Sequence, residues 1–211
     1  MYFKDRFDAG RRLAKELSKY KNKKDALILA IPRGALQIGS VLAKELNLPL
    51  DIIIVKKIPH PANPKYAIGA VGINEVIVNE DVVKAEDIPK VYINEQVKEL
   101  TEAIKEKYKK YRGGRPLPSL KNRTIIITDD GIATGHTMLA AVDILRKQNP
   151  KRIVLAVPVA PPDSLSKFKD KVDELICLET PVMFFAIGEF YENFLQVEDE
   201  EAIRLLKEGN K

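Results

Sequence analysis

Residues 124–137 read Thr-Ile-Ile-Ile-Thr-Asp-Asp-Gly-Ile-Ala-Thr-Gly-His-Thr, and the fold class follows from this stretch. Its apolar start, residues 124–128, is typical of a strand that is buried on both faces of a parallel sheet. Asp129 and Asp130 follow at the carboxyl end of that strand, the edge at which open parallel sheets bind their ligands. The stretch therefore predicts a ligand site in an α/β protein.

The turn after the two aspartates combines small residues with hydroxyl groups, at Gly131, Ala133, Thr134, Gly135 and Thr137. Such a turn can aim backbone N–H groups at a phosphate on the positive end of the next helix. The neighbouring carboxylates can accept hydrogen bonds from hydroxyl groups, so the whole segment suits a phosphorylated sugar. The plainer alternative is a capped turn with two exposed aspartates. The coincidence of so many ligand-suited features favours the sugar site.

Apolar strands alternate with helices along the rest of the chain. We expect strands at 26–31, 51–56, 124–128, 152–157 and 172–178, and helices at 5–20, 36–46, 87–112, 138–148 and 162–169. Strands that alternate with helices imply a parallel sheet with helices on both of its faces. We therefore predict an α/β fold with an open, mainly parallel five-stranded sheet. Two short segments, 67–71 and 75–78, are expected to form a hairpin.

The length of 211 residues fits a single domain, 1–211, in which two segments differ from the rest. Residues 57–70 begin with a loop rich in proline, and we expect this loop to be mobile. The tail after residue 181 is rich in aromatic side chains, namely Phe184, Phe185, Phe190, Tyr191 and Phe194. Their plainer role is packing in the core or in a small hood. Phe184, Phe185 and Tyr191 are also candidates to stack against an acceptor base.

Composition excludes several classes of protein. Hydrophobic residues make up 45% and charged residues 31%, as in ordinary globular domains. The longest apolar run, 153–160, is far shorter than the roughly 20 residues of a membrane-spanning helix. The N-terminus carries charge from Lys4 onward and lacks the apolar core of a signal peptide, so we expect a cytoplasmic protein. One cysteine and two histidines leave no internal disulfide and no histidine-rich metal site.

The formal net charge of +5 is a mild excess. It fits an anionic partner such as phosphate, but a solvated surface is the plainer interpretation. Abundant Lys and Glu without Trp resemble the composition of proteins from hyperthermophiles. The sequence contains no nucleotide-binding loop of the Walker or Rossmann type and no nucleophile elbow. Cys177 lies in an apolar strand and is expected to be an inert, buried thiol.

Residues 125–137 resemble the phosphoribosyl pyrophosphate (PRPP) signature of the type I phosphoribosyltransferase family. From Asp5-Arg6 onward, the chain is most similar to a group of predicted phosphoribosyltransferases whose acceptor is undefined. That group has Asp-Asp-Gly in the signature and an Asn-Pro pair in the mobile loop, here Asn63-Pro64. The resemblance implies the family's fold, with a hood formed from the terminal segments.

In that family the paired acids bind the ribose 2- and 3-hydroxyls, and the loop after them binds the 5-phosphate. Carried over to this sequence, Asp129 and Asp130 take the hydroxyls. The phosphate loop then consists of Ile132, Ala133, Thr134, Gly135, His136 and Thr137. Two residues depart from the pattern. Gly131 stands where many members have valine, which is expected to loosen the turn, and His136 replaces a common glycine and adds a candidate phosphate donor.

Two further segments resemble the diphosphate site of the family. Residues 31–35, Ile-Pro-Arg-Gly-Ala, resemble its first loop. The planar guanidinium of Arg33 can grip a diphosphate, and Gly34 lets the backbone approach closely. Lys56 and Lys57, at the end of the second expected strand, resemble the second diphosphate contact.

Residues 58–70 resemble the flexible catalytic loop of the family, with His60 and Lys65 as candidate groups. The resemblance thus implies four catalytic residues, Arg33, Lys57, Lys65 and Asp130. Mg²⁺ is the implied cofactor. It would rest mainly on the diphosphate and the sugar hydroxyls, with Asp129 and Asp130 as the protein groups within reach.

The implied activity is that of a Mg²⁺-dependent pentosyltransferase of nucleotide metabolism. It would move a phosphoribosyl group from PRPP to a nitrogen acceptor such as a nucleobase and release diphosphate. The implied partners are PRPP, the small-molecule acceptor and a second copy in a homodimer, without a membrane or a nucleic acid. The alternative is a PRPP-binding regulator or sensor that has lost the transfer. Retention of Arg33, Lys57 and the mobile loop favours the enzyme.

Overall fold

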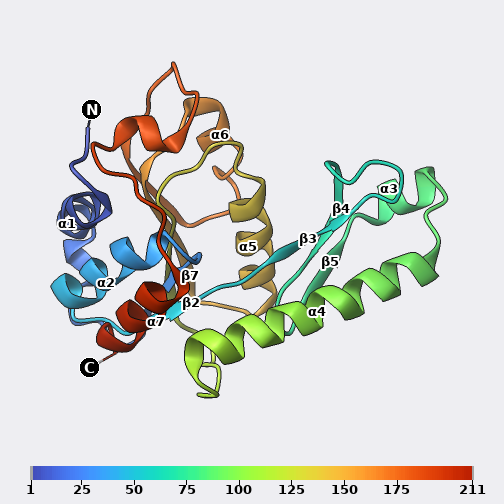
Figure 1. Cartoon of the computed structure of the whole chain (residues 1–211), viewed down its shortest axis with the longest axis horizontal. Helices are drawn as coiled ribbons and strands as arrows, with labels where there is room; N and C mark the ends of the chain where they lie inside the picture. The colour runs from blue at the N-terminus through green and yellow to red at the C-terminus, as the bar shows by residue number, and fades with distance from the viewer. Residues whose placement is uncertain (1, 211) are drawn as a thin grey trace.

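The computed structural model describes residues 2–210 of the chain (Figure 1). Its α-helices are α1 (Arg6–Glu16), α2 (Ala35–Leu46), α3 (Glu80–Ala85), α4 (Lys90–Arg112), α5 (His136–Lys147), α6 (Pro162–Ser166) and α7 (Asp199–Glu208), with 3-10 turns η1 (Ser18–Tyr20) and η2 (Ile187–Phe190). The strands are β1 (Ala26–Ala30), β2 (Leu50–Ile52), β3 (Lys56–Pro59), β4 (Ala67–Val71), β5 (Val76–Val78), β6 (Thr124–Thr128), β7 (Arg152–Val159) and β8 (Glu174–Glu179).

Five of these strands form the parallel sheet that the sequence predicts. Their order is β2-β1-β6-β7-β8, and every neighbouring pair is parallel. The central strand β6 pairs with β1 from Ala26↔Thr124 to Ala30↔Thr128. The carboxyl ends of β1 and β6 therefore lie side by side, which brings the loop at residue 31 next to the turn at residue 129.

Alternate residues of the strands serve two separate cores. Ile125 and Ile127 face α5, whereas Ile126 faces the layer that contains α1, α2 and α7. All three isoleucines are fully buried, and burial of such a side chain contributes about 1.5–3 kcal/mol. Helices cover both faces of the sheet, as predicted, and the strand that leads to the two aspartates is anchored from both sides.

A second sheet forms an arm that projects from the main body. Strands β3, β4 and β5 are antiparallel in that order, and α4 runs along them (Figure 1). The predicted hairpin of β4 and β5 is confirmed. The expected strand 51–56 is wrong in its second half, because β2 ends at Ile52 and Lys56 begins β3 in the other sheet. The apolar run thus crosses from one sheet to the next.

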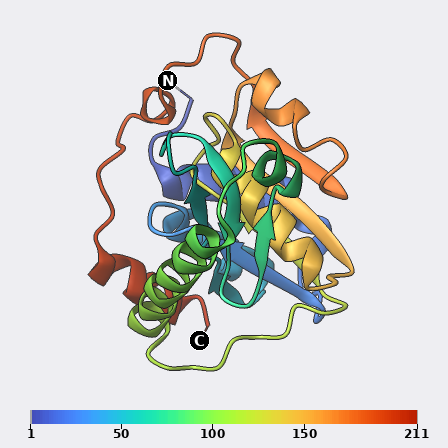
Figure 2. The same ribbon diagram turned by 90° about the vertical axis from the view of Figure 1, so that its right-hand side faces the viewer.

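The N-terminal segment of the chain packs against the segment around η2. Phe3 forms a parallel bridge with Tyr191 and donates its backbone N–H to the carbonyl of Phe190 at 3.0 Å. The segment after η2 then descends along the outside of the molecule to α7, which packs on α2 (Figure 2). Helix α7 is not among the helices expected from the sequence, although its first turn holds three consecutive acidic residues. Acidic side chains favour the positive end of a helix.

A buried ion pair ties the end of α4 to the start of β2. Arg112 Nη1 lies 3.1 Å from Asp51 Oδ2, and both side chains are less than one-tenth exposed. Arg112 also donates a hydrogen bond to the carbonyl of Pro116, and Asp51 accepts one from the backbone N–H of Ile52. The pair therefore fastens the arm to the main sheet.

We predict that Arg112→Met lowers the free energy of unfolding by about 3–5 kcal/mol, because it leaves Asp51 as an uncompensated buried charge. Urea denaturation measures the loss. The double variant Asp51→Asn with Arg112→Met should recover a large part of it. Lys105→Met, which removes an exposed pair with Glu102, is the control and should cost less than about 1 kcal/mol. Equal costs for the two single variants would contradict a role for the buried pair.

Candidate functional site

The adjacent ends of β1 and β6 place the loop of Arg33 against the two aspartates. Ile31 donates its backbone N–H to the carbonyl of Thr128 at 3.1 Å, which extends the pairing beyond the strands. The peptide bond between Pro32 and Arg33 is cis. A Cβ on Gly34 would lie 2.3 Å from Asp130 Oδ2, so only glycine permits this approach. Gly34 thus makes a close approach to Asp130, whereas its expected role toward a diphosphate stays a prediction.

The two aspartates differ in their surroundings. Asp129 Oδ1 accepts the backbone N–H of Asp130 at 2.9 Å, whereas Asp130 Oδ2 accepts Arg6 Nε at 2.8 Å. Removal from water, followed by the charge of Asp130, raises the pKa of Asp129 well above its usual range. The pair thus combines one carboxylate matched to a cation with one that holds its proton more tightly.

Side chains of α6 and of the residue after it donate hydrogen bonds to backbone carbonyl groups of the turn after Asp130. Ser164 Oγ donates to the carbonyl of Ala133, and Lys167 Nζ donates to that of Thr134 at 2.9 Å. Within residues 2–210, the backbone N–H groups from Ala133 to Met138 have no acceptor. They are therefore available to an anion at the start of α5, where the helix dipole also favours negative charge.

Ile132 does not belong to this set of free donors. Its N–H donates to the carbonyl of Val159 at 2.9 Å, and its side chain is buried in the core. The assignment of Ile132 as a group that wraps the phosphate therefore fits neither its side chain nor its amide. Ile132 anchors the turn to β7.

The two positions of the turn that hold glycine, 131 and 135, require it for different structural reasons. Gly135 precedes α5 with φ 80°, a left-handed conformation that glycine adopts at little cost. Gly131 is buried, and a Cβ there would lie 2.8 Å from the side chain of Ile187 and 3.1 Å from that of Val159. The expectation that Gly131 loosens the turn is wrong, because Gly131 makes room for the segment that covers the site.

Arg33, in the loop beside the aspartate turn, is paired with acidic groups of the C-terminal region. Its Nη1 lies 3.4 Å from Glu198 Oε2 and 3.8 Å from Asp199 Oδ1. The side chain remains about one-third exposed, at 35%. Asp199 is in turn held by Lys110 and by the hydroxyl of Tyr111. Glu198 and Asp199 thus lie against one terminal nitrogen of the Arg33 guanidinium.

Two lysines of the arm lie across a hollow from α5. Lys57, Lys65 and His136 line a hollow of about 490 Å³ between the three-stranded sheet and α5. Tyr66 and Asp143 contribute to the same walls. Lys56 is the first residue of β3 and is not among the lining residues. The fold thus gathers two of the lysines that were expected to act with His136 of the phosphate turn.

His60 is a structural residue of the loop. It is 7% exposed, its Nδ1 accepts the backbone N–H of Ala62 at 3.1 Å, and its Nε2 lies 2.8 Å from Glu86 Oε2. These contacts bind the loop to the end of α3. Both ring nitrogens thus lie against groups of the protein itself, an arrangement that favours a structural role for His60 over the suggested catalytic one.

The aromatic residues of the tail form a packed cluster. Tyr191 is buried, its ring contacts Phe3 and Phe194, and its hydroxyl donates to the backbone carbonyl of Asp130 at 2.6 Å. It therefore has no free face on which a base can stack. Phe184 stacks on Phe190 at 5.1 Å. Phe185 is 79% exposed and remains available as an acceptor contact.

Arg6 is the site residue that sequence reasoning missed. It lies in the first turn of α1, 124 residues before Asp130, and its side chain is only 7% exposed. Arginine is seldom buried without a partner, but nothing in the local sequence shows which partner it has.

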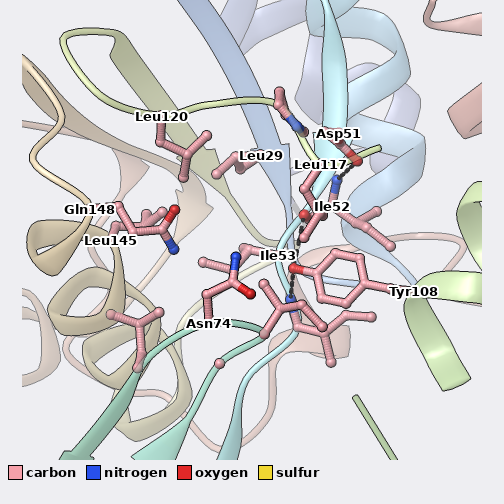
Figure 3. A pocket seen from close by; sticks show the side chains of 15 residues that line it. Leu29, Asp51, Ile52, Ile53, Asn74, Tyr108, Leu117, Leu120, Leu145 and Gln148 are labelled. Carbon is pink, nitrogen blue, oxygen red and sulfur yellow. Dashed lines mark hydrogen bonds between the residues drawn. The ribbon is translucent and has the colours of Figure 1, made fainter. Parts of the chain in front are cut away.

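A small cavity lies away from these groups. It measures about 50 Å³ and sits between β2, α4, α5 and the segment that holds Leu117 (Figure 3). Figure 3 shows Tyr108 beside it, whose hydroxyl accepts Ile54 N–H at 3.1 Å. Burial raises the pKa of Tyr108 to about 12. The lining includes no residue of the aspartate turn or of the Arg33 loop, so this cavity is not part of the candidate site.

Three further observations bear on function. No helix among residues 2–210 is both long enough and apolar enough to span a membrane. The same residues contain no group of three or more His, Cys, Asp or Glu side chains placed to hold a metal ion. Burial raises the pKa of the Cys177 thiol to about 11, so this group is not a nucleophile at neutral pH.

Comparison with known proteins assigns the family. The profile of the phosphoribosyl transferase domain matches residues 3–193. This chain belongs to the phosphoribosyl transferase domain family. Two curated relatives from strains of Mycobacterium tuberculosis, each named as a candidate phosphoribosyl transferase, are 36% identical over 210 residues, or 99% of this chain. The match covers 47% of each relative, so the chain spans about half their length.

Solved structures agree with the phosphoribosyl transferase fold. The crystal structure of TT1426 from Thermus thermophilus is 32% identical, covers all of both chains and has a TM-score of 0.89. A purine phosphoribosyltransferase from Pyrococcus horikoshii is 18% identical with a TM-score of 0.51, over 93% of this chain and 97% of its own. The second likeness is one of fold. The resemblance drawn from residues 125–137 is thereby confirmed.

We predict that Asp129→Asn raises the melting temperature of the unliganded protein at pH 8, by about 2–4 °C for each kcal/mol gained. The folded protein binds the Asp129 proton more tightly than the unfolded chain does, because the folded pKa is raised. The parent therefore loses stability as the pH rises through that raised pKa, and Asn has no proton to lose.

Thermal melts between about pH 3.5 and pH 8 test this prediction. The gain should shrink as the pH falls from the raised pKa of Asp129 and should vanish below the ordinary aspartate pKa of about 3.9, where Asp129 is protonated in both states. A gain that does not depend on pH would show that charge at Asp129 is not its cause.

Proposed function

We propose that this protein transfers a phosphoribosyl group from PRPP to a nitrogen acceptor, with release of diphosphate. Membership of the family supports a transferase. The observation that carries the PRPP assignment is the turn at 129–138. It sets two carboxylates beside a row of free backbone N–H groups, next to the loop of Arg33. These three features suit the ribose hydroxyls, the 5-phosphate and the diphosphate of one ligand.

In the proposed reaction, the bond between ribose C1 and the diphosphate oxygen breaks ahead of attack by the acceptor nitrogen. The sugar passes through an oxocarbenium-like centre, and C1 is inverted. Negative charge grows on the leaving diphosphate. Arg33 and Lys57 are the groups placed to stabilise it, and preorganised charges act best where water is excluded. We propose that the tip of the β3–β4 hairpin, with Lys65, closes over the ligand to exclude water.

Mg²⁺, when bound, would neutralise charge on the diphosphate and orient it. The residues present fit an ion that is held mainly by the ligand. Asp130 Oδ2 is engaged by Arg6, and the described residues offer no dedicated cluster of acidic or imidazole groups. Mg²⁺ commonly rests on substrate phosphates with only one or two carboxylates. Asp129 and Asp130 are the carboxylates within reach.

The aromatic residues of the tail suggest the class of acceptor. Among the aromatic residues named from the sequence, Phe185 keeps its ring exposed, whereas Tyr191 is used for packing. A nucleobase is therefore the proposed acceptor class. The second candidate function is a PRPP-binding regulator without transfer. The pairing of Arg33 with Glu198 and Asp199 favours it, because these acids must yield before a diphosphate can bind.

Diphosphate release separates the two functions. The full chain is incubated with PRPP, Mg²⁺ and a panel of nucleobases, and diphosphate is measured. Release that depends on one base establishes the transferase and names its acceptor. Binding of PRPP by calorimetry without release for any base would support the regulator. Absence of PRPP binding would overturn both.

We predict that Asp130→Asn weakens PRPP binding roughly 10- to 100-fold, since a hydrogen bond to a charged group contributes about 1.5–3 kcal/mol. Calorimetry measures the change. The matched control is Asp163→Asn in α6, which changes an aspartate that is not one of the proposed ribose contacts. This variant should bind PRPP like the parent. If Asp130→Asn also binds like the parent, the ribose assignment is wrong.

We predict that Lys65→Ala lowers turnover roughly tenfold or more and changes PRPP affinity much less. A closing loop acts mainly on the transition state, so its loss appears in kcat. Steady-state kinetics with PRPP as the varied substrate give kcat and KM. Lys121→Ala, an exposed lysine before β6, should alter neither. A fall in affinity as large as the fall in rate would argue against closure.

A further inference from the structure

The guanidinium of Arg6 meets three groups from three parts of the chain. Its Nε donates to Asp130 Oδ2 at 2.8 Å, and its Nη1 donates to the backbone carbonyl of Leu195 at 2.9 Å. Its plane lies over the ring of Phe194, 3.7 Å from the ring centroid. The Arg6 residue is only 6% exposed. Such a set of contacts fixes the side chain in one position.

Arg6 is also the cation that balances the two acids. Among residues 2–210, no other basic side chain lies within 4.0 Å of the Asp129 or Asp130 carboxylate. Asp130 Oδ1 has no donor among the same residues, whereas Oδ2 is taken by Arg6. One oxygen of Asp130 is thus held in place while the other remains open to a ligand.

The surrounding backbone leaves Asp130 little freedom. Gly34 approaches so closely that a Cβ there would lie 2.3 Å from Asp130 Oδ2 and 2.9 Å from Arg6 Nε. Tyr191 donates its hydroxyl to the backbone carbonyl of Asp130. The segment 191–195 therefore holds Asp130 in two ways. The Tyr191 hydroxyl holds the main chain of Asp130, and Phe194 and Leu195 hold the Asp130 carboxylate through Arg6.

We propose that Arg6 is a positioning residue of the ribose site. It orients Asp130 so that Oδ1 faces a sugar hydroxyl, and it links this carboxylate to the covering segment at Phe194 and Leu195. This inference rests on the proposed binding of PRPP. It assigns the preference for a ribosyl over a 2-deoxyribosyl ligand to a residue of the N-terminal helix that does not itself touch the sugar.

The geometry requires arginine. Its planar fork donates in two directions at once and stacks on an aromatic ring, whereas a lysine ammonium is a single point charge on a flexible stem. Lysine at position 6 would retain the charge opposite Asp130 but could not also keep the contacts with Leu195 and Phe194. Substitution with lysine can therefore separate the positive charge of Arg6 from its contacts with Leu195 and Phe194.

Calorimetry on the full chain tests the inference with three probes: ribose 5-phosphate, 2-deoxyribose 5-phosphate and inorganic phosphate. The variants are Arg6→Gln, Arg6→Lys and the control Arg11→Gln, an exposed arginine of the same helix. We expect Arg6→Gln to weaken the binding of ribose 5-phosphate roughly 10- to 100-fold. The same variant should reduce the ratio of the affinities for ribose 5-phosphate and 2-deoxyribose 5-phosphate, and it should leave the affinity for inorganic phosphate unchanged. Arg6→Lys should be intermediate, and Arg11→Gln should match the parent.

Two outcomes would overturn it. An Arg6→Gln protein that keeps the full ribose preference shows that Asp130 needs no positioning. If both Arg6 variants lose affinity for ribose 5-phosphate and for inorganic phosphate to the same extent, Arg6 has a general structural role. Melting temperatures identify a variant that fails to fold, in which case Arg6→Lys alone decides. A parent that does not distinguish the two sugars refutes the proposed function itself, which the Arg6 variants cannot do.

Discussion

The close approach of Gly34 to the Asp130 carboxylate governs the layout of the whole site. A side chain at position 34 would occupy the space of Asp130 Oδ2, so the loop after β1 and the turn after β6 fit together only with glycine there. The parallel pairing of β1 with β6 brings the two loops to this distance. Arg33, the aspartates and the free amides of the turn consequently share one edge of the sheet.

Charged groups of the unliganded site are matched by segments far away in sequence. Arg6 of α1 balances Asp130, and Glu198 and Asp199 at the start of α7 face Arg33. Arg6 also contacts Leu195, and Asp199 also contacts Tyr111. A charge in a partly dry site is costly without a partner. The acidic groups that balance Arg33 thus also help to hold the C-terminal segment.

Much of the fold and of the site could be predicted because local patterns carry it. The isoleucines at 125–127 need two apolar faces, so a central parallel strand is their natural place, and the aspartates follow at its ligand-binding end. The roles of His60, Ile132 and Gly131 could not be predicted in the same way. Their partners, which include Glu86, Val159 and Ile187, come from other elements. A histidine or a glycine in a loop looks the same in sequence whether it serves a ligand or a neighbour.

Local sequence was enough to establish the family, the five-stranded sheet and the position of the aspartate turn, because hydrophobic period and turn composition act over a few residues. Three features emerged only once the elements were packed together: the run after Ile52 enters a second sheet, α7 returns to Arg33, and Arg6 reaches Asp130 across 124 positions. The energy of an ion pair or a close backbone approach depends on distance in space, which local sequence does not encode.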